Sequence, residues 1–168
     1  MTLHTGPGCT LSSNASKSAT GRLISPLCPT TRTSNAGCAF SDPSSSSFGA
    51  GFNNAGGGVF AHLWNSAEIS IWRFPRGSIP SDITSKNPNP SNWGPPVAFF
   101  PSSDLCDISS HFFDHSLVID TTLCGDWAGA AFSGSGCSGT CQEAVANPAN
   151  FKSELSGWII STLTNYLL

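Results

Sequence analysis

Seven cysteines in 168 residues restrict this chain more than any other feature of its sequence. Such a density indicates disulfide bonds and an oxidising compartment. Because the number is odd, either one thiol is free or its partner lies outside the chain. A zinc site is a poor fit, since Cys137 and Cys141 have no second pair of ligands at a matching spacing. We therefore expect no metal and no other cofactor.

The composition narrows the classes of partner. Only 10% of the residues are charged, whereas about a quarter is usual. The net charge is −3 and there is no basic cluster, so nucleic acid and anionic membranes are poor partners. The sequence also lacks an apolar run long enough to span a membrane. Many aromatic residues on a neutral polar background suit a neutral polar ligand, of which carbohydrate is the obvious class.

Short apolar runs separated by long polar segments predict strands joined by loops. The expected strands are residues 1–5, 59–64, 68–74, 97–101 and 116–122. Residues 6–58 show almost no periodicity, and residues 77–96 contain five prolines, so both segments are expected to be loops. A short helix is expected at residues 142–146, whereas residues 158–168 fit either a helix or a strand. This pattern predicts an all-β sandwich with disulfide-bearing loops.

Alternation within the strand at residues 68–74 separates two faces. Ile69, Ile71 and Arg73 share one face, while Trp72 and Phe74 share the other. His62, on the preceding strand, is expected to be a structural or surface histidine rather than a ligand.

Two segments carry candidate acids. Asp104 and Asp107 flank Cys106, which predicts a disulfide-anchored loop with aspartates as turn residues rather than a paired-acid site. Cys124, Asp126 and Trp127 follow the strand at residues 116–122, where we expect a surface loop. Trp127 there either forms a binding wall or folds back onto the edge of the sandwich.

Six motifs, in their order and rough spacing, resemble the fungal endo-1,3(4)-β-glucanases (laminarinases) of glycoside hydrolase family 16. They are Met1-Thr2-Leu3-His4-Thr5-Gly6, Gly56-Gly57-Gly58, Phe74-Pro75-Arg76, Asn92-Trp93-Gly94-Pro95, Ala98-Phe99-Phe100-Pro101 and Leu123-Cys124-Gly125-Asp126-Trp127-Ala128-Gly129. The resemblance implies a partial concanavalin-like β-jelly-roll sandwich. Residues 1–151 would be the C-terminal portion of the family's domain, and residues 152–168 a divergent tail.

The resemblance also implies retaining hydrolysis of β-1,3- or mixed β-1,3/1,4-glucans by two glutamates in a Glu-x-Asp-x-x-Glu strand. This sequence contains no such pattern. Its acids are Asp42, Glu68, Asp82, Asp104, Asp107, Asp114, Asp120, Asp126, Glu143 and Glu154. We therefore expect no catalytic residue in this chain and little or no hydrolase activity, with the chain beginning just after the family's catalytic strand.

Three residues match substrate-binding positions of that family. His4 matches a histidine that faces the catalytic carboxylates, with a buried structural histidine as the alternative. Trp127 matches a tryptophan that stacks on a sugar ring, and Asp126 is either a partner of sugar hydroxyls or a turn stabiliser. Trp64, Trp72 and Trp93 are expected to serve packing.

The expected protein is thus a β-glucanase-like, extracellular monomer that contacts β-1,3- or mixed-linkage glucan. The alternatives are a non-catalytic secreted glucan-binding protein and a disulfide-stapled structural protein. Residues 1–7 lack the basic and apolar regions of a signal peptide, so we expect that Met1 is not the natural beginning of the domain. The sequon at Asn14 agrees with secretion.

Overall fold

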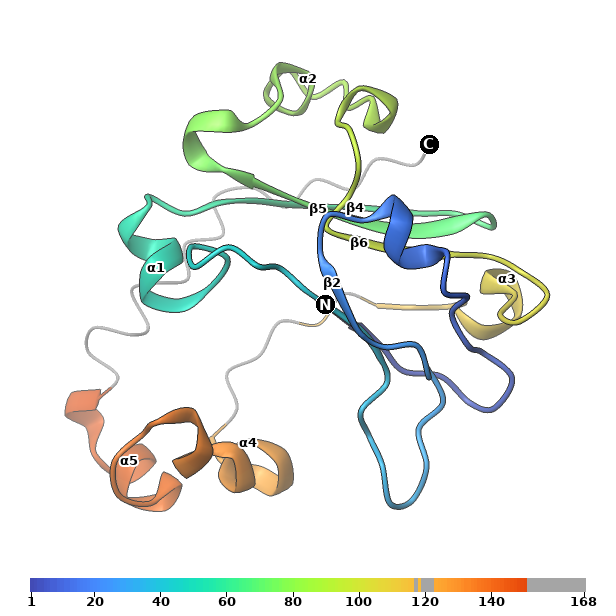
Figure 1. The fold of residues 1–168 in the computed structure, drawn as a ribbon. Coiled ribbons are helices and arrows are strands. Elements are labelled where there is room, and N and C mark those ends of the chain that lie inside the picture. Colours follow the sequence, from blue (N-terminus) through green and yellow to red (C-terminus); the bar gives the residue numbers. More distant parts are fainter. Residues whose placement is uncertain (117, 119–122, 151–168) are drawn as a thin grey trace. The chain divides into compact units, whose positions relative to one another are not determined.

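The computed structural model describes residues 1–116, 118 and 123–150 (Figure 1). The chain forms two compact units, Met1–His115 and Ser116–Leu168, and each unit is described here by itself. No helix in the described residues is long and apolar enough to cross a membrane.

The first sheet of unit 1 lies in a segment where the sequence predicted mostly loop. Its strands are β1 (Thr2–Leu3), β2 (Arg22–Ser25) and β3 (Cys38–Ser41), antiparallel in the order β1-β3-β2. The prediction of residues 6–58 as loop was therefore wrong for β2 and β3. Strands of four residues are too short to show a clear hydrophobic period. They are stabilised by pairing with β3 at the centre of the sheet and by the disulfide between Cys28 and Cys38.

The second sheet confirms the strands predicted for this part of the chain. β4 (Gly58–Trp64), β5 (Glu68–Pro75) and β6 (Ala98–Pro101) are antiparallel in the order β4-β5-β6. The turn between β4 and β5 is built by Asn65, whose Oδ1 accepts hydrogen bonds from the backbone N–H groups of Ala67 at 2.8 Å and Glu68 at 3.0 Å.

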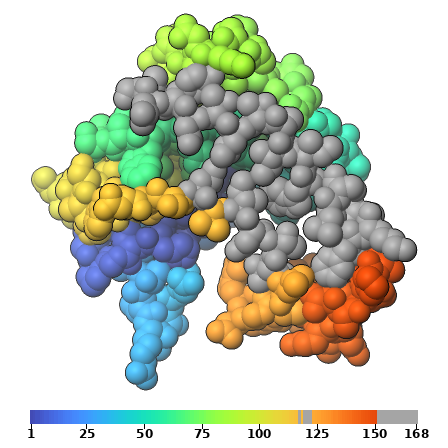
Figure 2. Space-filling model, turned by 180° about the vertical axis from the view of Figure 1, so that it is seen from behind, coloured from blue at the N-terminus to red at the C-terminus, as the bar shows by residue number. Residues whose placement is uncertain are grey.

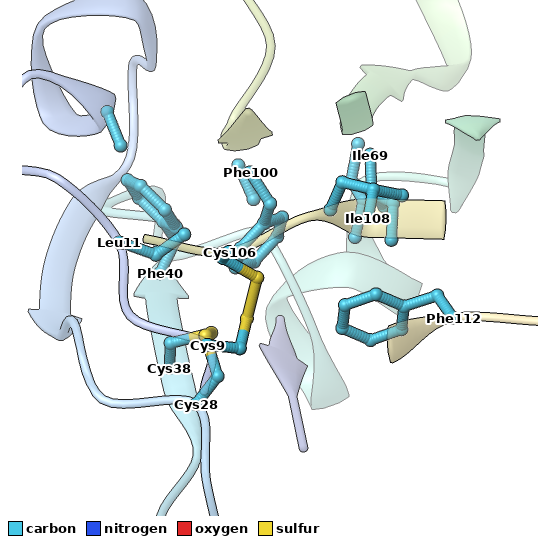
Figure 3. Packing of buried hydrophobic residues seen from close by; sticks show 13 residues of the cluster. Cys9, Leu11, Cys28, Cys38, Phe40, Ile69, Phe100, Cys106, Ile108 and Phe112 are labelled. Carbon is cyan, nitrogen blue, oxygen red and sulfur yellow. A yellow bond between two sulfur atoms is a disulfide. The ribbon is translucent and has the colours of Figure 1, made fainter. Parts of the chain in front are cut away.

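The core of unit 1 contains residues from both sheets (Figure 3). The rings of Phe40 on β3 and Phe100 on β6 meet edge to face, with 5.3 Å between their centroids. Ile69 and Ile71, which the alternation placed on one face of β5, both belong to the buried core cluster. The antiparallel, mostly sheet-based structure confirms the predicted all-β fold class.

Three disulfides confirm the interpretation of the cysteines: Cys9–Cys106, Cys28–Cys38 and Cys124–Cys141. The odd cysteine is Cys137, which is exposed and has no disulfide partner in the described residues.

The loop around Cys106 has the predicted character. Asp107 caps α3 (Ile108–His111), accepting hydrogen bonds from the backbone N–H groups of Ser109 and Ser110. The hydroxyl of Ser110 and these backbone donors lower the pKa of Asp107 from its ordinary value. The carboxylate therefore stabilises the loop.

The connections contain short helical turns that the sequence did not predict. They are η1 (Ala15–Ser18), α1 (Gly49–Asn54), η2 (Arg76–Ser78), α2 (Ser81–Thr84) and η3 (Pro90–Asn92), of which the η elements are 3₁₀ helices. Between β2 and β3, exposed residues 31–36 form the tip of a narrow projection of unit 1 (Figure 2).

The outer face of β5 is covered by the proline-rich segment. Trp72 is buried, and its Nε1 donates a hydrogen bond to the backbone oxygen of Gly94 at 2.9 Å. Trp93 packs edge to face against Trp72 and Phe74, with centroid distances of 5.2 Å and 5.5 Å. Trp72 and Trp93 therefore serve packing, as predicted.

Asp82 organises this segment by accepting hydrogen bonds from the backbone N–H groups of Ile83 and Asn89 and from Nε1 of Trp93, each at 2.8 Å. Desolvation, the largest influence, raises the pKa of Asp82, but these hydrogen bonds together outweigh it and place the pKa below the ordinary 3.8.

We predict that the indole N–H resonance of Trp93 shifts only at unusually low pH. A carboxyl whose pKa is lowered by folding contributes stability above its unfolded pKa, and this contribution disappears as the pH falls through the folded pKa. NMR from about pH 6 to about pH 2 measures the shift. The internal control is the Trp72 indole, whose acceptor does not titrate. A Trp93 transition at or above the ordinary aspartate pKa contradicts the prediction.

Unit 2 contains α4 (Gly125–Ala131), η4 (Ser133–Ser135), α5 (Cys141–Ala146) and η5 (Pro148–Asn150). The short helix expected at residues 142–146 is confirmed as α5. The surface loop expected after Cys124 is instead a helix, α4, so that prediction was wrong. Five of the seven residues in the predicted strand 116–122, and the whole of residues 152–168, lie outside the described residues. The predicted boundary at residue 151 stays a prediction.

Candidate functional site

The first candidate site is the start of α4, which is fixed by an unusual backbone turn. Cys124 and Gly125 both have left-handed conformations, with φ of 67° and 78°. This conformation is uncommon for a residue other than glycine. The disulfide to Cys141, the first residue of α5, ties the beginnings of the two helices together. The turn that carries the candidate residues is therefore covalently anchored.

The beginning of α5 is stabilised by a capping box. The Thr140 hydroxyl accepts a hydrogen bond from the backbone N–H of Glu143 at 3.2 Å. The Glu143 carboxylate in turn accepts from the Thr140 backbone N–H at 3.0 Å and hydroxyl at 2.9 Å. The backbone N–H, then the hydroxyl, lower the pKa of Glu143. Glu143 is thus an ionised helix cap that supports the anchored turn.

Asp126 and Trp127 lie in the first turn of α4, and both are exposed. The Trp127 side chain is 84% exposed, so its ring is available for contact. An exposed flat apolar ring can stack on a sugar ring, and an exposed carboxylate can accept hydrogen bonds from sugar hydroxyls. The binding role of both residues stays a prediction.

His4 directly follows β1 in unit 1 and is exposed. Its ring lies against Gly37, which has a left-handed φ of 67°, and a Cβ added to Gly37 would lie 2.9 Å from Cε1 of His4. A larger residue at position 37 would therefore displace the ring. The structure places His4 at the surface beside β3, and its role stays a prediction.

The second candidate site is a groove of about 370 Å³ in unit 1. It is lined by the residue before β1, by the end of β3 and the residue after it, by the segment before α1 and by β4: Met1, Phe40, Ser41, Asp42, Ser47, Phe48 and Phe60. The aromatic side chains make the groove largely apolar. Reasoning from the sequence did not find it, because its residues come from distant parts of the chain.

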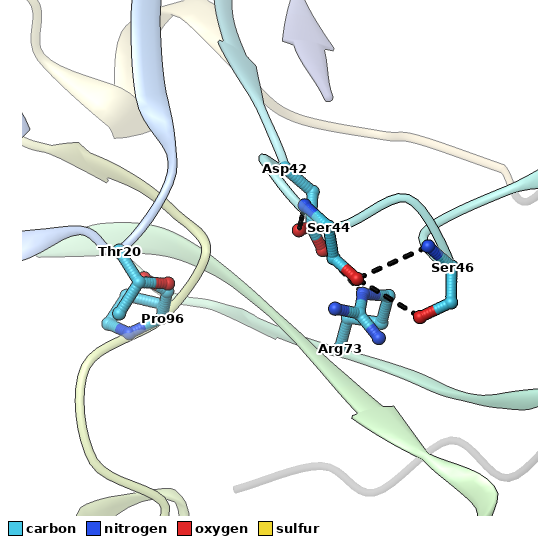
Figure 4. A network of polar contacts seen from close by, with 6 residues as sticks. All are labelled: Thr20, Asp42, Ser44, Ser46, Arg73 and Pro96. Carbon is cyan, nitrogen blue, oxygen red and sulfur yellow. Dashed lines mark hydrogen bonds and ion pairs between the residues drawn. The ribbon is translucent and has the colours of Figure 1, made fainter.

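Asp42 at this groove forms an ion pair with Arg73 (Figure 4). The two side chains are only 7% and 10% exposed, and Asp42 also accepts a hydrogen bond from the backbone N–H of Ser44 at 2.9 Å. Arg73 occupies the face of β5 that carries Ile69 and Ile71. A cation on a core-facing row was the signal that an acidic partner had to exist.

Five aspartate and glutamate side chains in the described residues form hydrogen bonds or an ion pair that stabilise local structure. Asp42, Asp82, Asp107 and Glu143 hold an ion pair, a loop and two helix caps, and Glu68 accepts a hydrogen bond from the Ser70 hydroxyl at 3.1 Å. Among the described residues, no three His, Cys, Asp or Glu side chains lie close enough together to hold a metal ion. His4 belongs to unit 1, while Asp126 and Trp127 belong to unit 2.

The sequence is similar to curated fungal glycosidases over almost its whole length. It is 42% identical to a "Probable glycosidase" of Schizosaccharomyces pombe, with 99% of this chain and 40% of the relative aligned. It is 39% identical to an "Endo-1,3(4)-beta-glucanase" of Arthroderma benhamiae, with 98% of this chain and 37% of the relative aligned. The chain thus spans about two fifths of the length of these relatives.

Solved structures show the same relationship in three dimensions. A mutant of Laminarinase 16A that cyclizes laminariheptaose matches 91% of this chain with a TM-score of 0.77 and 40% identity. An elongating family 16 β-1,3-glucosyltransferase matches 92% with a TM-score of 0.79 and 36% identity. In both cases the match covers 52% of the solved chain. The fold is therefore that of part of the jelly-roll domains of this family.

A family model described as "XgeA-like, catalytic GH16 domain" matches residues 1–166. Together with identities near 40% over the chain, this match confirms the resemblance that the motifs of the sequence indicated. The chain belongs to glycoside hydrolase family 16, among its XgeA-like members.

Proposed function

We propose that this chain is the glucan-binding portion of a family 16 β-glucanase and that it binds β-1,3- or mixed-linkage glucans without hydrolysing them on its own. The observation that carries the proposal is the exposed Trp127 ring on an anchored turn in a member of this family. A related solved structure, Laminarinase 16A from Phanerochaete chrysosporium, is described as holding two β-glucans in its donor and acceptor sites.

In the proposed binding mode, Trp127 stacks on a glucose ring and Asp126 accepts hydrogen bonds from adjacent hydroxyls. Neutral sugars offer hydroxyl donors and weakly apolar ring faces, which this pair complements. The disulfide between Cys124 and Cys141 limits the conformational entropy lost on binding, because the turn is already fixed. For unit 1 we propose separately that the exposed His4 contacts glucan.

The proposed lack of hydrolysis follows from the acids of the chain. Retaining hydrolysis requires two carboxyl groups about 5 Å apart, one as nucleophile and one as acid and base. The sequence has three glutamates, Glu68, Glu143 and Glu154, and none belongs to a Glu-x-Asp-x-x-Glu pattern. Glu143 is already committed to capping α5. The chemistry would require carboxylates that this chain does not supply.

We predict that Trp127→Ala weakens the binding of laminari-oligosaccharides about tenfold, because the stacking surface is lost. Isothermal titration calorimetry of the purified chain measures the change. The matched control is Phe113→Ala, which removes another exposed aromatic ring, in unit 1. If Trp127→Ala binds as tightly as the parent, the proposed platform is wrong.

The absence of hydrolysis is tested by measuring reducing-sugar release from laminarin and from barley β-glucan. We expect no release above the rate without protein. Clear turnover by the purified 168-residue chain would refute this part of the proposal, whereas the calorimetric test of binding would stand independently.

A second candidate function is a disulfide-stapled structural protein outside the cell, which the three disulfides favour. We propose an extracellular location and a monomeric state under either function. Immunodetection in the culture medium tests the location. The structural role gains support if neither the binding assay nor the hydrolysis assay responds.

A further inference from the structure

We propose that Asn14 is the attachment site of an N-linked glycan and that this glycan shields the exposed side of η1. The sequence Asn14-Ala15-Ser16 has the form Asn-x-Ser, which the oligosaccharide-transferring enzyme of the secretory pathway modifies when x is not proline. The inference rests on the proposed extracellular location, and it does not depend on glucan binding.

No other asparagine of the sequence meets this requirement. The nearest match is Asn89-Pro90-Ser91, in which proline occupies the middle position and prevents the modification. The chain therefore contains one candidate acceptor and one unreactive counterpart, and the second serves as an internal control.

The side chain of Asn14 is free to carry a glycan at the surface of unit 1. Asn14 directly precedes η1, the blue helical turn in Figure 1; it is exposed, and its side chain does not cap the helix. By contrast, the side-chain amides of Asn65, Asn147 and Asn150 are hydrogen-bonded to backbone groups. A sugar on the Asn14 amide nitrogen therefore breaks no capping contact.

The transfer reaction needs only this amide nitrogen from the chain. The donor is an oligosaccharide linked through diphosphate to a lipid. The Nδ2 atom of Asn14 forms a bond to the anomeric carbon of the first sugar, and the bond from that carbon to the diphosphate oxygen breaks. The lipid diphosphate leaves, and one amide proton is lost. The product is a neutral, strongly hydrated group at an exposed position.

The turn that carries Asn14 is anchored from its inner side. Leu11 and Ala15 are buried in the core cluster, and η1 packs against β6. The outer side is polar: Ser16 is exposed, and its hydroxyl donates a hydrogen bond to the backbone oxygen of Ser13 at 2.9 Å. A glycan on this side displaces no apolar contact, so the modified turn keeps the same packing.

The sequon is available to the transferring enzyme before the turn is fixed. Cys9, which anchors the segment before Asn14, pairs with Cys106, 97 positions later in the chain. This disulfide cannot form until residue 106 has been synthesised, whereas the N-terminal residues emerge first. Residues 14–16 therefore meet the enzyme as unfolded chain, and folding afterwards leaves Asn14 at the surface.

The geometry of η1 determines what the glycan covers. The backbone N–H of Lys17 donates a hydrogen bond to the backbone oxygen of Asn14 at 3.0 Å. Residues three positions apart on a 3₁₀ helix lie one above the other, so Asn14 and Lys17 share one side of the turn. Lys17 is exposed, and trypsin cleaves after lysine. A glycan on Asn14 should therefore obstruct the access of trypsin to Lys17.

The attachment site is tested with the full 168-residue chain behind a cleavable secretion signal, both secreted from yeast and translated with endoplasmic-reticulum microsomes. Digestion with an N-glycosidase, which converts the modified asparagine to aspartate, should increase the electrophoretic mobility of the parent and of Ser16→Thr. It should leave Asn14→Gln and Ser16→Ala unchanged. Mass spectrometry of the digested parent should find the conversion in the tryptic peptide of residues 1–17 and none at Asn89.

Limited digestion of the folded protein with trypsin tests the shielding. Cleavage after Lys17 should be severalfold slower in the glycosylated parent than in Asn14→Gln. The matched control is Arg32, which is exposed in residues 31–36 and should be cleaved at the same rate in both proteins. Because Asn14 is exposed and makes no capping bond, its replacement is not expected to prevent folding.

Two results would overturn the inference. If translocated chains of the parent do not respond to the N-glycosidase, or if the response persists in Asn14→Gln, Asn14 is not the acceptor. The microsomes score the site whether or not the chain folds, so this outcome is decisive. Equal rates of cleavage after Lys17 in the parent and in Asn14→Gln would refute the shielding. Neither readout uses glucan, and the signal is supplied, so failure here is distinguishable from failure of glucan binding or of the proposed location.

Discussion

Replacing both Cys9 and Cys106 by alanine should lower the free energy of unfolding by about 4.7 kcal/mol. The bond joins residues 97 positions apart. Closing a loop of about this length lowers the conformational entropy of the unfolded chain, and the loss corresponds to this free energy. Both cysteines are buried in the core of unit 1, where they join the N-terminal segment to the loop before α3 (Figure 3). Urea denaturation monitored by tryptophan fluorescence measures the loss.

The matched control is the pair Cys28→Ala and Cys38→Ala. These cysteines are equally buried, but they are only 10 residues apart, so the same relation gives a loss of about 2.7 kcal/mol. The difference between the two double variants isolates the effect of loop length. Equal losses would show that packing of the sulfur atoms, rather than loop closure, determines the effect. Cys137→Ala, at an exposed free thiol, should change the stability by less than about 0.5 kcal/mol.

Changing Arg73 to Met should lower the free energy of unfolding by about 3 kcal/mol. The change removes the cation but keeps much of the apolar stem, and it leaves the nearly buried Asp42 carboxylate without its ion-pair partner. The unpaired charge loses solvation from water without gaining compensation from protein. Thermal and urea denaturation at neutral pH measure the loss.

A double variant separates the charge effect from packing. Arg73→Met together with Asp42→Leu removes both charges, so we expect a loss of about 1 kcal/mol or less, smaller than that of Arg73→Met alone. Arg76→Met is the positional control, because this arginine is exposed and donates one hydrogen bond to the backbone oxygen of Gly56 at 3.1 Å. A loss for Arg76→Met as large as that for Arg73→Met would argue against the buried ion pair as the cause.

Much of the fold could be predicted from local patterns. β4 and β5 are long enough for alternation to show, and the Asn65 turn between them has a recognisable composition. The capped helix α5 carries its signal in the spacing of Thr140 and Glu143. Each of these features depends on residues close together in the sequence.

Other elements escaped prediction because their stabilising contacts are distant. β2 and β3 have four residues each, and their pairing with each other defines them more than their own composition does. The sequence at Cys124 and Gly125 suggested a loop. In the structure, helix α4 begins directly after Cys124, which is bonded to Cys141. The glycines of this segment favoured a loop and did not reveal that a helix follows the turn.

Some residues of the candidate sites could be identified from the sequence, and others were found only in the structure. Trp127 and Asp126 were identified by motif, and their neighbourhood in one helical turn follows from their adjacency in the chain. The groove and the ion pair beside it were not identified from the sequence. Asp42 and Arg73 are 31 residues apart, and the position of one gives no information about the position of the other. The sequence analysis placed Arg73 on the same face of β5 as Ile69 and Ile71, but it did not predict an acidic partner for this residue.

The amino-acid sequence by itself determined the family, the all-β class and the presence of disulfides, since these depend on motifs, short periodicities and composition. The tertiary structure alone decided which cysteines pair, which thiol stays free, and which remote residues line the groove at Asp42. The physical reason is that disulfide pairing and burial are properties of distances between remote segments. Such distances are set when sheets pack, and no local pattern encodes them.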